Sequence, residues 1–423
     1  MAHRCSVIRT LLLLLCCFTI VSCGGDDPAS PSDKEPNSSR TFDVVWKDHV
    51  AYFDSTMLGS ILSLDTAQYQ YHFQKSSPLA SSLQHGDILV VHGQAVRRVT
   101  KITVSGDAII VETEEAYLTD AIKSGKIGWS YTPAFDSAIT PALIVDGVQH
   151  PMAKMSDPHG GFTHKFESGA YRYEISMNFI GDKAEVNCSI REKSGVGVGT
   201  TFTLNGTIQQ LTSQSEIVFT DGTVSNVTYK NKNVTGKLTV GMEVKQSSDF
   251  GVKLPVTLLK FPFLIGPIPA SLNVRLEWAV TSQIPLGGHA NVASTFTFDS
   301  ETGFRYDGSQ FHAEGIAGNW SATTDTVSSG AVGALAAEFA IGFPQVEIDI
   351  LSKSFVSYAR PTFLVRGDYS VSGLNGASCQ RAKAVFAGIV GVKLSALGLV
   401  NLSEKQLQLW AAEKELLKLG QCQ

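Results

Sequence analysis

The sequence predicts a mainly β protein made of antiparallel, β-sandwich-like domains, with a short helix near its C-terminal end. Three observations predict this fold class. From residue 41 onward, apolar and polar residues alternate with a period of two, as in half-buried strands. Turn dipeptides separate the alternating runs. The chain of 423 residues is 43% hydrophobic and only 17% charged, which is enough apolar material for a sizeable core.

The first residues have the pattern of a targeting signal rather than of a folded element. Arg4 and Arg9 precede an apolar run from Leu11 to Val21, which is shorter than the about 20 apolar residues that a spanning helix needs. The run ends in Ile20-Val21-Ser22-Cys23, with a small residue directly before a cysteine.

This ending resembles the lipobox of bacterial lipoproteins, and the resemblance covers residues 1–23. In that family the cysteine sulfur receives a diacylglycerol, the chain is cut just before the cysteine, and the new amine is usually acylated. The resemblance implies that residues 1–22 are a signal peptide and that lipidated Cys23 holds the protein on a membrane. The alternative is an ordinary signal peptide cut near Ser22, which would leave Cys23 as a thiol.

Residues 23–41 are interpreted as the lipidated tether. The stretch from Gly24 to Arg40 is rich in Pro, Ser and Asp and has no apolar periodicity, which is typical of a flexible linker. Asp26 and Asp27 resemble export signals of surface lipoproteins in some Gram-negative groups, although a solvated linker would look similar. We therefore expect the protein at the outer membrane or cell surface. Its net charge of -5, without a basic block, argues against a nucleic-acid partner.

A small β-rich domain is predicted over residues 42–135 and a large antiparallel one over residues 136–400. Strands are expected at 69–73, 88–91, 99–104 and 109–113, followed by a short helix at 118–123. The stretch 86–127 resembles small β-modules of secreted bacterial proteins, without a functional motif. In the large domain, alternation over 171–179 and 184–190 around Gly181-Asp182 predicts a hairpin. Further inward rows and the turn pairs Asn205-Gly206, Asp221-Gly222 and Asp307-Gly308 continue the pattern.

The C-terminal segment, residues 401–423, is predicted to be a helix packed on the β domain. Ser403 and Gln406 have the spacing of a capping box. Leu409, Ala412, Leu416 and Leu419 would form one apolar face, and Gly420 would end the helix.

The cysteines suggest one disulfide outside the cytoplasm. Of the seven, Cys5, Cys16 and Cys17 would leave with the signal peptide, and Cys23 would take lipid. Cys188 lies in a dry strand row between Val186 and Ile190, where a thiol behaves as a small hydrophobe. The favoured pair is therefore Cys379 with Cys422, although three thiols allow three single pairings.

No catalytic motif, metal site or cofactor site is predicted. The histidine-rich stretch with His150, Asp157, His159 and His164 matches no metal-ligand spacing and is interpreted as a loop. Asp299, Glu301 and Asp307 offer too few oxygens for calcium, so a hairpin loop is preferred. The glycine series 195, 197, 199 lacks the last glycine of a dinucleotide fingerprint.

These features favour a non-enzymatic, envelope-anchored lipoprotein with an adhesive, structural or binding role. A glycan-binding module is the first alternative and would need exposed aromatics such as Trp129, Tyr131 or Trp320. A lipid-binding module would need a cavity lined by Leu254–Ala270, whose four prolines argue against a central strand; burial of that segment is preferred. The second alternative is a hydrolase whose residues meet only in space.

Overall fold

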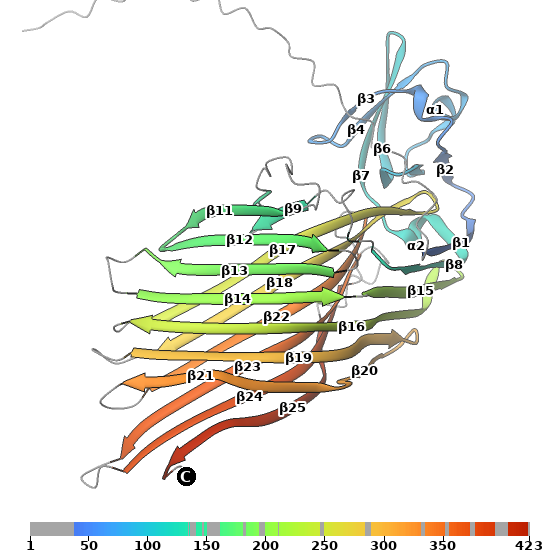
Figure 1. Ribbon diagram of the computed structural model, residues 1–423. Helices are drawn as coiled ribbons and strands as arrows, with labels where there is room; N and C mark the ends of the chain where they lie inside the picture. The colour runs from blue at the N-terminus through green and yellow to red at the C-terminus, as the bar shows by residue number, and fades with distance from the viewer. Residues whose placement is uncertain are drawn as a thin grey trace, which may run out of the picture. The chain divides into compact units, whose positions relative to one another are not determined.

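The computed structural model describes residues 38–133, 135, 141–145, 148–149, 161–180, 183–193, 199–209, 211–245, 249–283, 289–330, 335–351, 355–372, 377–393 and 405–421. Residues 35–423 form one compact unit. Its elements are almost all strands, arranged in three sheets, so the prediction of a mainly β, largely antiparallel protein is confirmed (Figure 1). Within the described ranges, no helix has both the length and the apolar content to cross a membrane.

The smallest sheet has six strands and occupies the N-terminal part of the described chain. In spatial order its strands are β2 (Val50–Phe53), β5 (Ile88–Val91), β6 (Ala95–Ser105), β7 (Ala108–Glu115), β4 (Gln70–Gln74) and β3 (Ile61–Asp65). A 3-10 turn, η1 (Leu58–Ser60), and a short helix, α1 (Pro78–Ser82), connect them. Helix α1 begins where Ser77 Oγ accepts a hydrogen bond from the Ala80 N–H at 3.3 Å, which satisfies an otherwise free donor.

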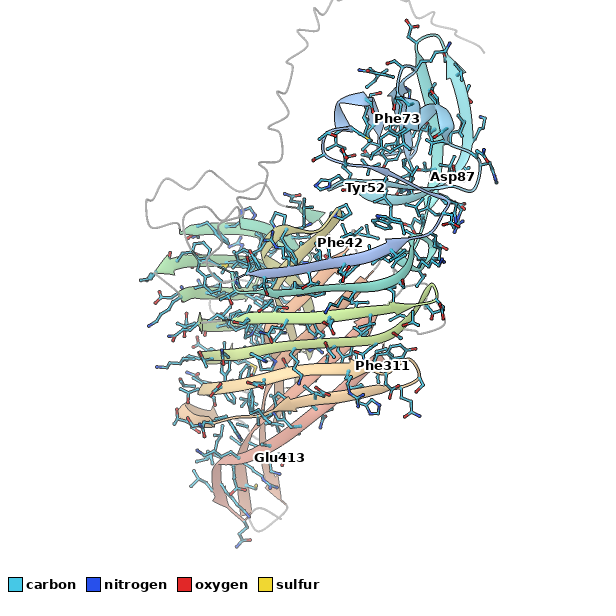
Figure 2. All side chains as sticks on the ribbon, turned by 90° about the vertical axis from the view of Figure 1, so that its right-hand side faces the viewer. Phe42, Tyr52, Phe73, Asp87, Phe311 and Glu413 are labelled. Carbon is cyan, nitrogen blue, oxygen red and sulfur yellow. The ribbon has the colours of Figure 1, made fainter. Side chains whose placement is uncertain are left out.

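The largest sheet has eleven strands. Its main path runs through β1 (Ser39–Trp46), β8 (Ile122–Tyr131), β15 (Thr212–Thr220), β16 (Thr223–Lys245), β14 (Gly199–Gln209), β13 (Lys183–Glu192), β12 (Tyr171–Ile180) and β11 (Phe162–Ser168). On the other side of β16 lies β19 (His289–Tyr306), which also pairs with β20 (Phe311–Ile316) and β21 (Trp320–Gly330). Phe42 on β1 and Phe311 on β20 lie toward opposite edges of this sheet (Figure 2).

The third sheet is antiparallel and has eight strands. Its order is β10 (Val148–Gln149), β9 (Pro141–Val145), β17 (Asp249–Ile265), β18 (Ile268–Gln283), β22 (Leu335–Ile350), β23 (Phe355–Ser372), β24 (Ala377–Lys393) and β25 (Lys405–Gly420). All of its neighbouring strands in the described chain pair antiparallel.

The two large sheets share one apolar core, because alternate residues of their strands point toward each other. The Phe202 ring on β14 meets the Trp278 ring on β18 edge to face at 6.0 Å, and the Phe296 and Phe363 rings lie 4.9 Å apart. Gly206 faces this core against the Phe343 ring, which a side chain at position 206 would strike. The predicted turn at Asn205-Gly206 is therefore wrong, since both residues lie inside β14.

The predicted hairpin and its dry row are confirmed. Strands β12 and β13 pair antiparallel from Tyr171 with Glu192 to Ile180 with Lys183. Cys188 is 4% exposed among Val186 and Ile190, and burial raises the pKa of its thiol. The turns at Asp221-Gly222 and Asp307-Gly308 also join strands as predicted, with positive φ at Gly222 and Gly308.

The six-stranded sheet covers only part of the predicted 42–135 domain, because β1 and β8 at its two ends join the eleven-stranded sheet. The chain between β7 and β8 forms the short helix α2 (Leu118–Ala121), close to the predicted 118–123. Contacts also link the sheets: the Gly93 N–H donates to the Pro267 carbonyl oxygen at 2.9 Å. The domain boundaries themselves stay a prediction.

The C-terminal helix prediction is wrong, because residues 405–420 form strand β25. β25 pairs with β24 along its length, with irregularities where one residue has no direct partner. These extra residues are Leu409 and Leu416, seven positions apart. Each bulge inserts one extra residue and so shifts by one position the alternation of side chains between the two faces of the strand. The apolar residues of the bulged strand then have a spacing that is typical of a helix. Ser403 lies outside the described residues.

The expectation that prolines keep Leu254–Ala270 out of a central strand is also wrong. Pro255 and Pro262 lie in β17, between β9 and β18. β9, however, pairs with β17 only from Val256 to Leu259, so both prolines fall where that side of β17 has no partner strand in the described sheet. The preferred interpretation of burial is confirmed: Val256, Leu259 and Phe263 are at most 3% exposed.

Candidate functional site

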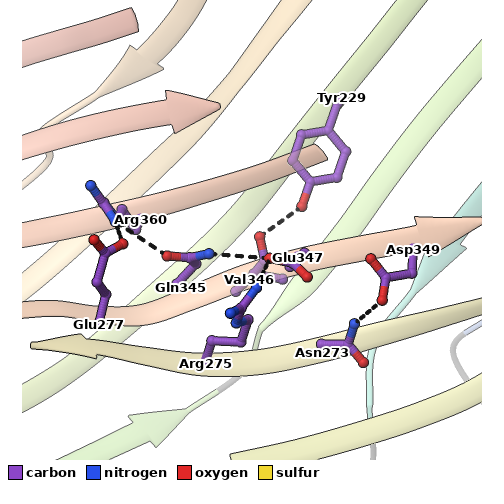
Figure 3. A network of polar contacts seen from close by, with 9 residues as sticks. All are labelled: Tyr229, Asn273, Arg275, Glu277, Gln345, Val346, Glu347, Asp349 and Arg360. Atoms are coloured by element: carbon purple, nitrogen blue, oxygen red, sulfur yellow. Dashed lines mark hydrogen bonds and ion pairs between the residues drawn. The ribbon is translucent and has the colours of Figure 1, made fainter. Parts of the chain in front are cut away.

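A network of charged and amide side chains lies on the eight-stranded sheet, on the face turned away from the apolar core (Figure 3). On β22, Val346 and Ile348 point into the core and are fully buried, so Gln345, Glu347 and Asp349 project to the other face. There Gln345, Glu347 and Asp349 are only 4–8% exposed. Because burial removes these side chains from most of the solvent, their hydrogen bonds form mainly with other groups of the protein.

A continuous chain of contacts joins strands β18, β22 and β23. Arg360 forms an ion pair with Glu277 and donates from Nη1 to Gln345 Oε1 at 3.4 Å. Gln345 Nε2 donates to Glu347 Oε2 at 3.2 Å, and Arg275 Nη1 binds the same oxygen at 2.6 Å. Two cations and two anions therefore neutralise each other, and the network bridges three neighbouring strands.

From the core side, Tyr229 on β16 reaches the backbone of the same strand. Its hydroxyl donates to the Val346 carbonyl oxygen at 3.2 Å. Burial raises the pKa of the Tyr229 hydroxyl, which keeps it a neutral donor. The hydrogen bond thus ties the eleven-stranded sheet to β22 beside the network.

Asp349 is a carboxyl group beside this network whose pKa is raised. Asn273 Nδ2 donates to Asp349 Oδ2 at 2.8 Å, while Asp349 Oδ1 and Asn273 Oδ1 have no partner among the described residues. Burial, with the negative charge of Glu347 second, raises the pKa of Asp349 to about 6. Lys260 and Arg275 act in the opposite direction but do not cancel the rise.

The raised pKa of Asp349 predicts a loss of stability as the pH rises. The unfolded carboxyl titrates near about pH 4, whereas the folded one holds its proton to about pH 6. Between these values the folded state binds more protons, so the free energy of unfolding falls with rising pH, by on the order of 2 kcal/mol. Urea unfolding across this range should show that fall in the wild type and not in Asp349→Asn.

Asp307→Asn is a control of opposite sign. Hydrogen bonds, first from the Gln310 N–H and then from Ser309, lower the pKa of Asp307 below its usual range. The ionised Asp307 carboxylate therefore stabilises the fold at neutral pH, and this contribution is lost as the pH falls. Asp307→Asn should thus lower the free energy of unfolding mainly at neutral pH. If Asp349→Asn kept the wild-type slope, the assignment to Asp349 would be wrong.

The loop around Asp307 holds the described serine, histidine and aspartate that come closest to a hydrolase triad. Ser309 Oγ donates to Asp307 Oδ1 at 2.7 Å, and His312 Nε2 lies 2.7 Å from Asp307 Oδ2. Asp307 thus stands between serine and histidine, whereas nucleophile activation needs histidine in the middle. The arrangement is a carboxylate-stabilised turn between β19 and β20, as the sequence favoured over a calcium site.

The sequence-predicted site residues are scattered. Cys23 and Cys422 lie outside the described residues, as do His150, Asp157 and His159, while His164 lies on β11. Among the residues that the structure describes, no three metal-ligating side chains gather. Trp129 and Tyr131 are 4% and 3% exposed and pack against Phe263, so they form no exposed glycan groove. Trp320 is half-buried against Phe386.

The proposed disulfide can be tested through Cys379. The register of β24 and β25 places Cys379 opposite Gly420, two residues before Cys422. We predict that Cys379→Ser lowers the free energy of unfolding by about 3–4 kcal/mol, because the bridge would close a loop of about 44 residues in the unfolded chain. Cys422→Ser should cost the same, and the double variant no more. A reactive Cys379 thiol in the native, unreduced protein would contradict the pairing.

Comparison with protein-family models, with curated proteins and with solved structures found no match for this chain. The polar network was not singled out from the sequence, because its polar residues simply alternate with apolar ones in strands β18 and β22.

Proposed function

We propose that this chain is a lipid-anchored protein of the bacterial cell envelope, whose β-sheet body has a structural, adhesive or binding role rather than a catalytic one. The observation that carries the proposal is the lipobox-like Ile20-Val21-Ser22-Cys23 after a short apolar run. Acyl chains on Cys23 would insert into the membrane, with each buried CH2 contributing about 0.8 kcal/mol.

The position of the first strand agrees with a β-sheet body that is joined to the lipid anchor by a linker. β1 begins at Ser39, 16 residues after Cys23. A chain of that length reaches at most about 55 Å when fully extended, so a body carried on Cys23 could stand clear of the lipid surface. The acidic residues Asp26 and Asp27 support display at the cell surface.

Within the body, we propose that the two large sheets form the layers of a β-sandwich. Ring contacts such as Phe202 with Trp278 and the Tyr229–Val346 hydrogen bond support this, since each joins one sheet to the other. The self-neutralised polar network supports a structural role, because Glu347 and Asp349 are buried and engaged instead of open to a substrate.

Replacing Cys23 by Ser tests the anchor. We expect the wild type to sediment with membranes and to incorporate labelled palmitate, and the Cys23→Ser variant to lose the label and leave the membrane fraction. Cys17→Ser is the matched control, because it removes a nearby thiol and keeps the lipobox. A Cys23→Ser protein that stays membrane-bound, or a wild type without label, would contradict the proposal.

A further inference from the structure

The outer face of the eleven-stranded sheet carries two polar hollows along the same strand, β16. The first, of about 340 Å3, lies at the C-terminal half of β16 and is called the far hollow; its polar lining includes Thr207, Gln209, Thr235, Lys237, Asp299 and Asn319. The second, of about 460 Å3, lies at the N-terminal half and is called the near hollow; its polar lining includes Thr41, Ser130, Gln214, Glu216, Thr228 and Lys230.

Strand register explains how the far hollow is assembled. Gln209 on β14, Thr235 on β16 and Asp299 on β19 are direct cross-strand partners. Their neighbours Ile208 and Phe298 are buried in the core, so the polar side chains must project outward. Lys237 and Asp299 are both exposed, and neither has an ion-pair partner among the residues that the structure describes.

The lining of the near hollow includes Gly128, which has no side chain. Gly128 on β8 lies between Thr41 on β1 and Glu216 on β15 in one cross-strand row. On the next row, Ser130, Gln214 and Lys230 lie side by side, and Gln214 Nε2 donates to Ser130 Oγ at 3.1 Å. Hydroxyl, amide and charged groups therefore surround the near hollow.

The lining points to the chemistry of the ligand. Each hollow combines hydroxyl and amide groups with one lysine and one carboxylate, so neither attracts a strongly charged ligand. The linings also contain one large aromatic residue each, Phe298 in the far hollow and Trp129 in the near hollow, but both are only 4% exposed, so neither offers the exposed apolar anchor that is typical of protein interfaces. What matches is an uncharged molecule whose hydroxyl groups both donate and accept hydrogen bonds, which is a neutral saccharide.

The separation of the hollows sets the length of that ligand. Lys230 and Lys237 are seven residues apart on β16, which corresponds to about 20 Å along the strand. A single sugar cannot contact both hollows, whereas an extended chain can engage them together and gain from the second contact.

We propose that this face binds an extended neutral polysaccharide along β16, with the two hollows as its contact sites. The inference deepens the binding role proposed above and depends on it. The sugar would be held by hydrogen bonds from side chains, without the exposed aromatic residues that the glycan-binding alternative was expected to need.

An array of neutral oligosaccharides of four or more sugars tests the proposal, probed with the full-length protein in detergent. Binding to at least one of them should weaken about tenfold or more in Gln209→Ala/Asp299→Ala, and also in Gln214→Ala/Thr228→Ala, since each pair removes several hydrogen bonds. The matched control is Asn187→Ala/Glu185→Ala, an amide and a carboxylate on β13, on the same face but outside both hollows. Heparin serves as a polyanionic probe.

Two results would overturn this inference. One is a folded protein that binds no neutral oligosaccharide, or only heparin. The other is a control variant that loses as much binding as the hollow variants. If such a protein still carries lipid on Cys23 and sediments with membranes, the saccharide inference fails while the envelope proposal stands.

Discussion

Replacing Arg275 by Met is expected to lower the free energy of unfolding by about 3 kcal/mol. The Glu347 side chain is only 7% exposed, and Arg275 Nη1 at 2.6 Å is its cationic partner. Without that guanidinium, Glu347 would be left as a buried charge beside Asp349, and Gln345 Nε2 would be its remaining side-chain donor among the described residues. Urea unfolding of the wild type and the variant at neutral pH measures the loss.

A double replacement distinguishes the destabilisation caused by an unpaired buried charge from the net contribution of the ion pair to the free energy of unfolding. Arg275→Met with Glu347→Leu removes both partners, and we expect it to recover most of the loss, because apolar residues of similar volume can replace a buried ion pair at little cost. Lys165→Met, which breaks the exposed pair with Glu174 at 3.1 Å, is the control and should change stability by less than about 1 kcal/mol. If the double variant were as unstable as Arg275→Met, the loss of stability would not come from the unpaired charge of Glu347.

Replacing Phe363 by Ala is expected to cost about 3–5 kcal/mol. Phe363 on β23 is fully buried, and its ring lies 4.9 Å and 5.0 Å from those of Phe296 and Phe298 on the opposite sheet. It also lies 5.1 Å from Phe386 on its own sheet, so the truncation leaves a cavity where the two sheets meet. Calorimetry or urea unfolding should detect one cooperative transition at lower stability.

Ile316→Ala is the matched control for that prediction. Ile316 is an apolar residue on β20 that is 60% exposed, so its truncation removes little buried surface. We expect a change within about 0.5 kcal/mol. If Phe363→Ala and Ile316→Ala lowered the free energy of unfolding equally, the two large sheets would not share the core described above.

Local patterns predicted the antiparallel sheets well, because a strand with one buried face alternates apolar and polar residues in its own sequence. The alternation around Cys188 located both strands of the β12–β13 hairpin and the burial of the thiol. The pairs Asp221-Gly222 and Asp307-Gly308 marked real turns. Asn205-Gly206 did not, because Gly206 is needed for the close approach of the Phe343 ring, which no local pattern reveals.

The sequence predictions that were wrong or missing concern features that depend on the pairing with neighbouring strands. The bulges at Leu409 and Leu416 in β25 mimic helical spacing, and their cause lies in the register with β24. The prolines of β17 are tolerated because β9 is short. In the polar network, Glu347 alternates with apolar neighbours like any solvent-facing residue, so its burial and its pairing with Arg275 were invisible in the sequence.

Mass spectrometry of the mature N-terminal peptide is the most direct test of the proposed lipid anchor at Cys23. We predict that the peptide begins at Cys23 and carries the added mass of a diacylglycerol on its sulfur. A peptide that begins at another residue, or an unmodified Cys23 at the amino terminus, would contradict it.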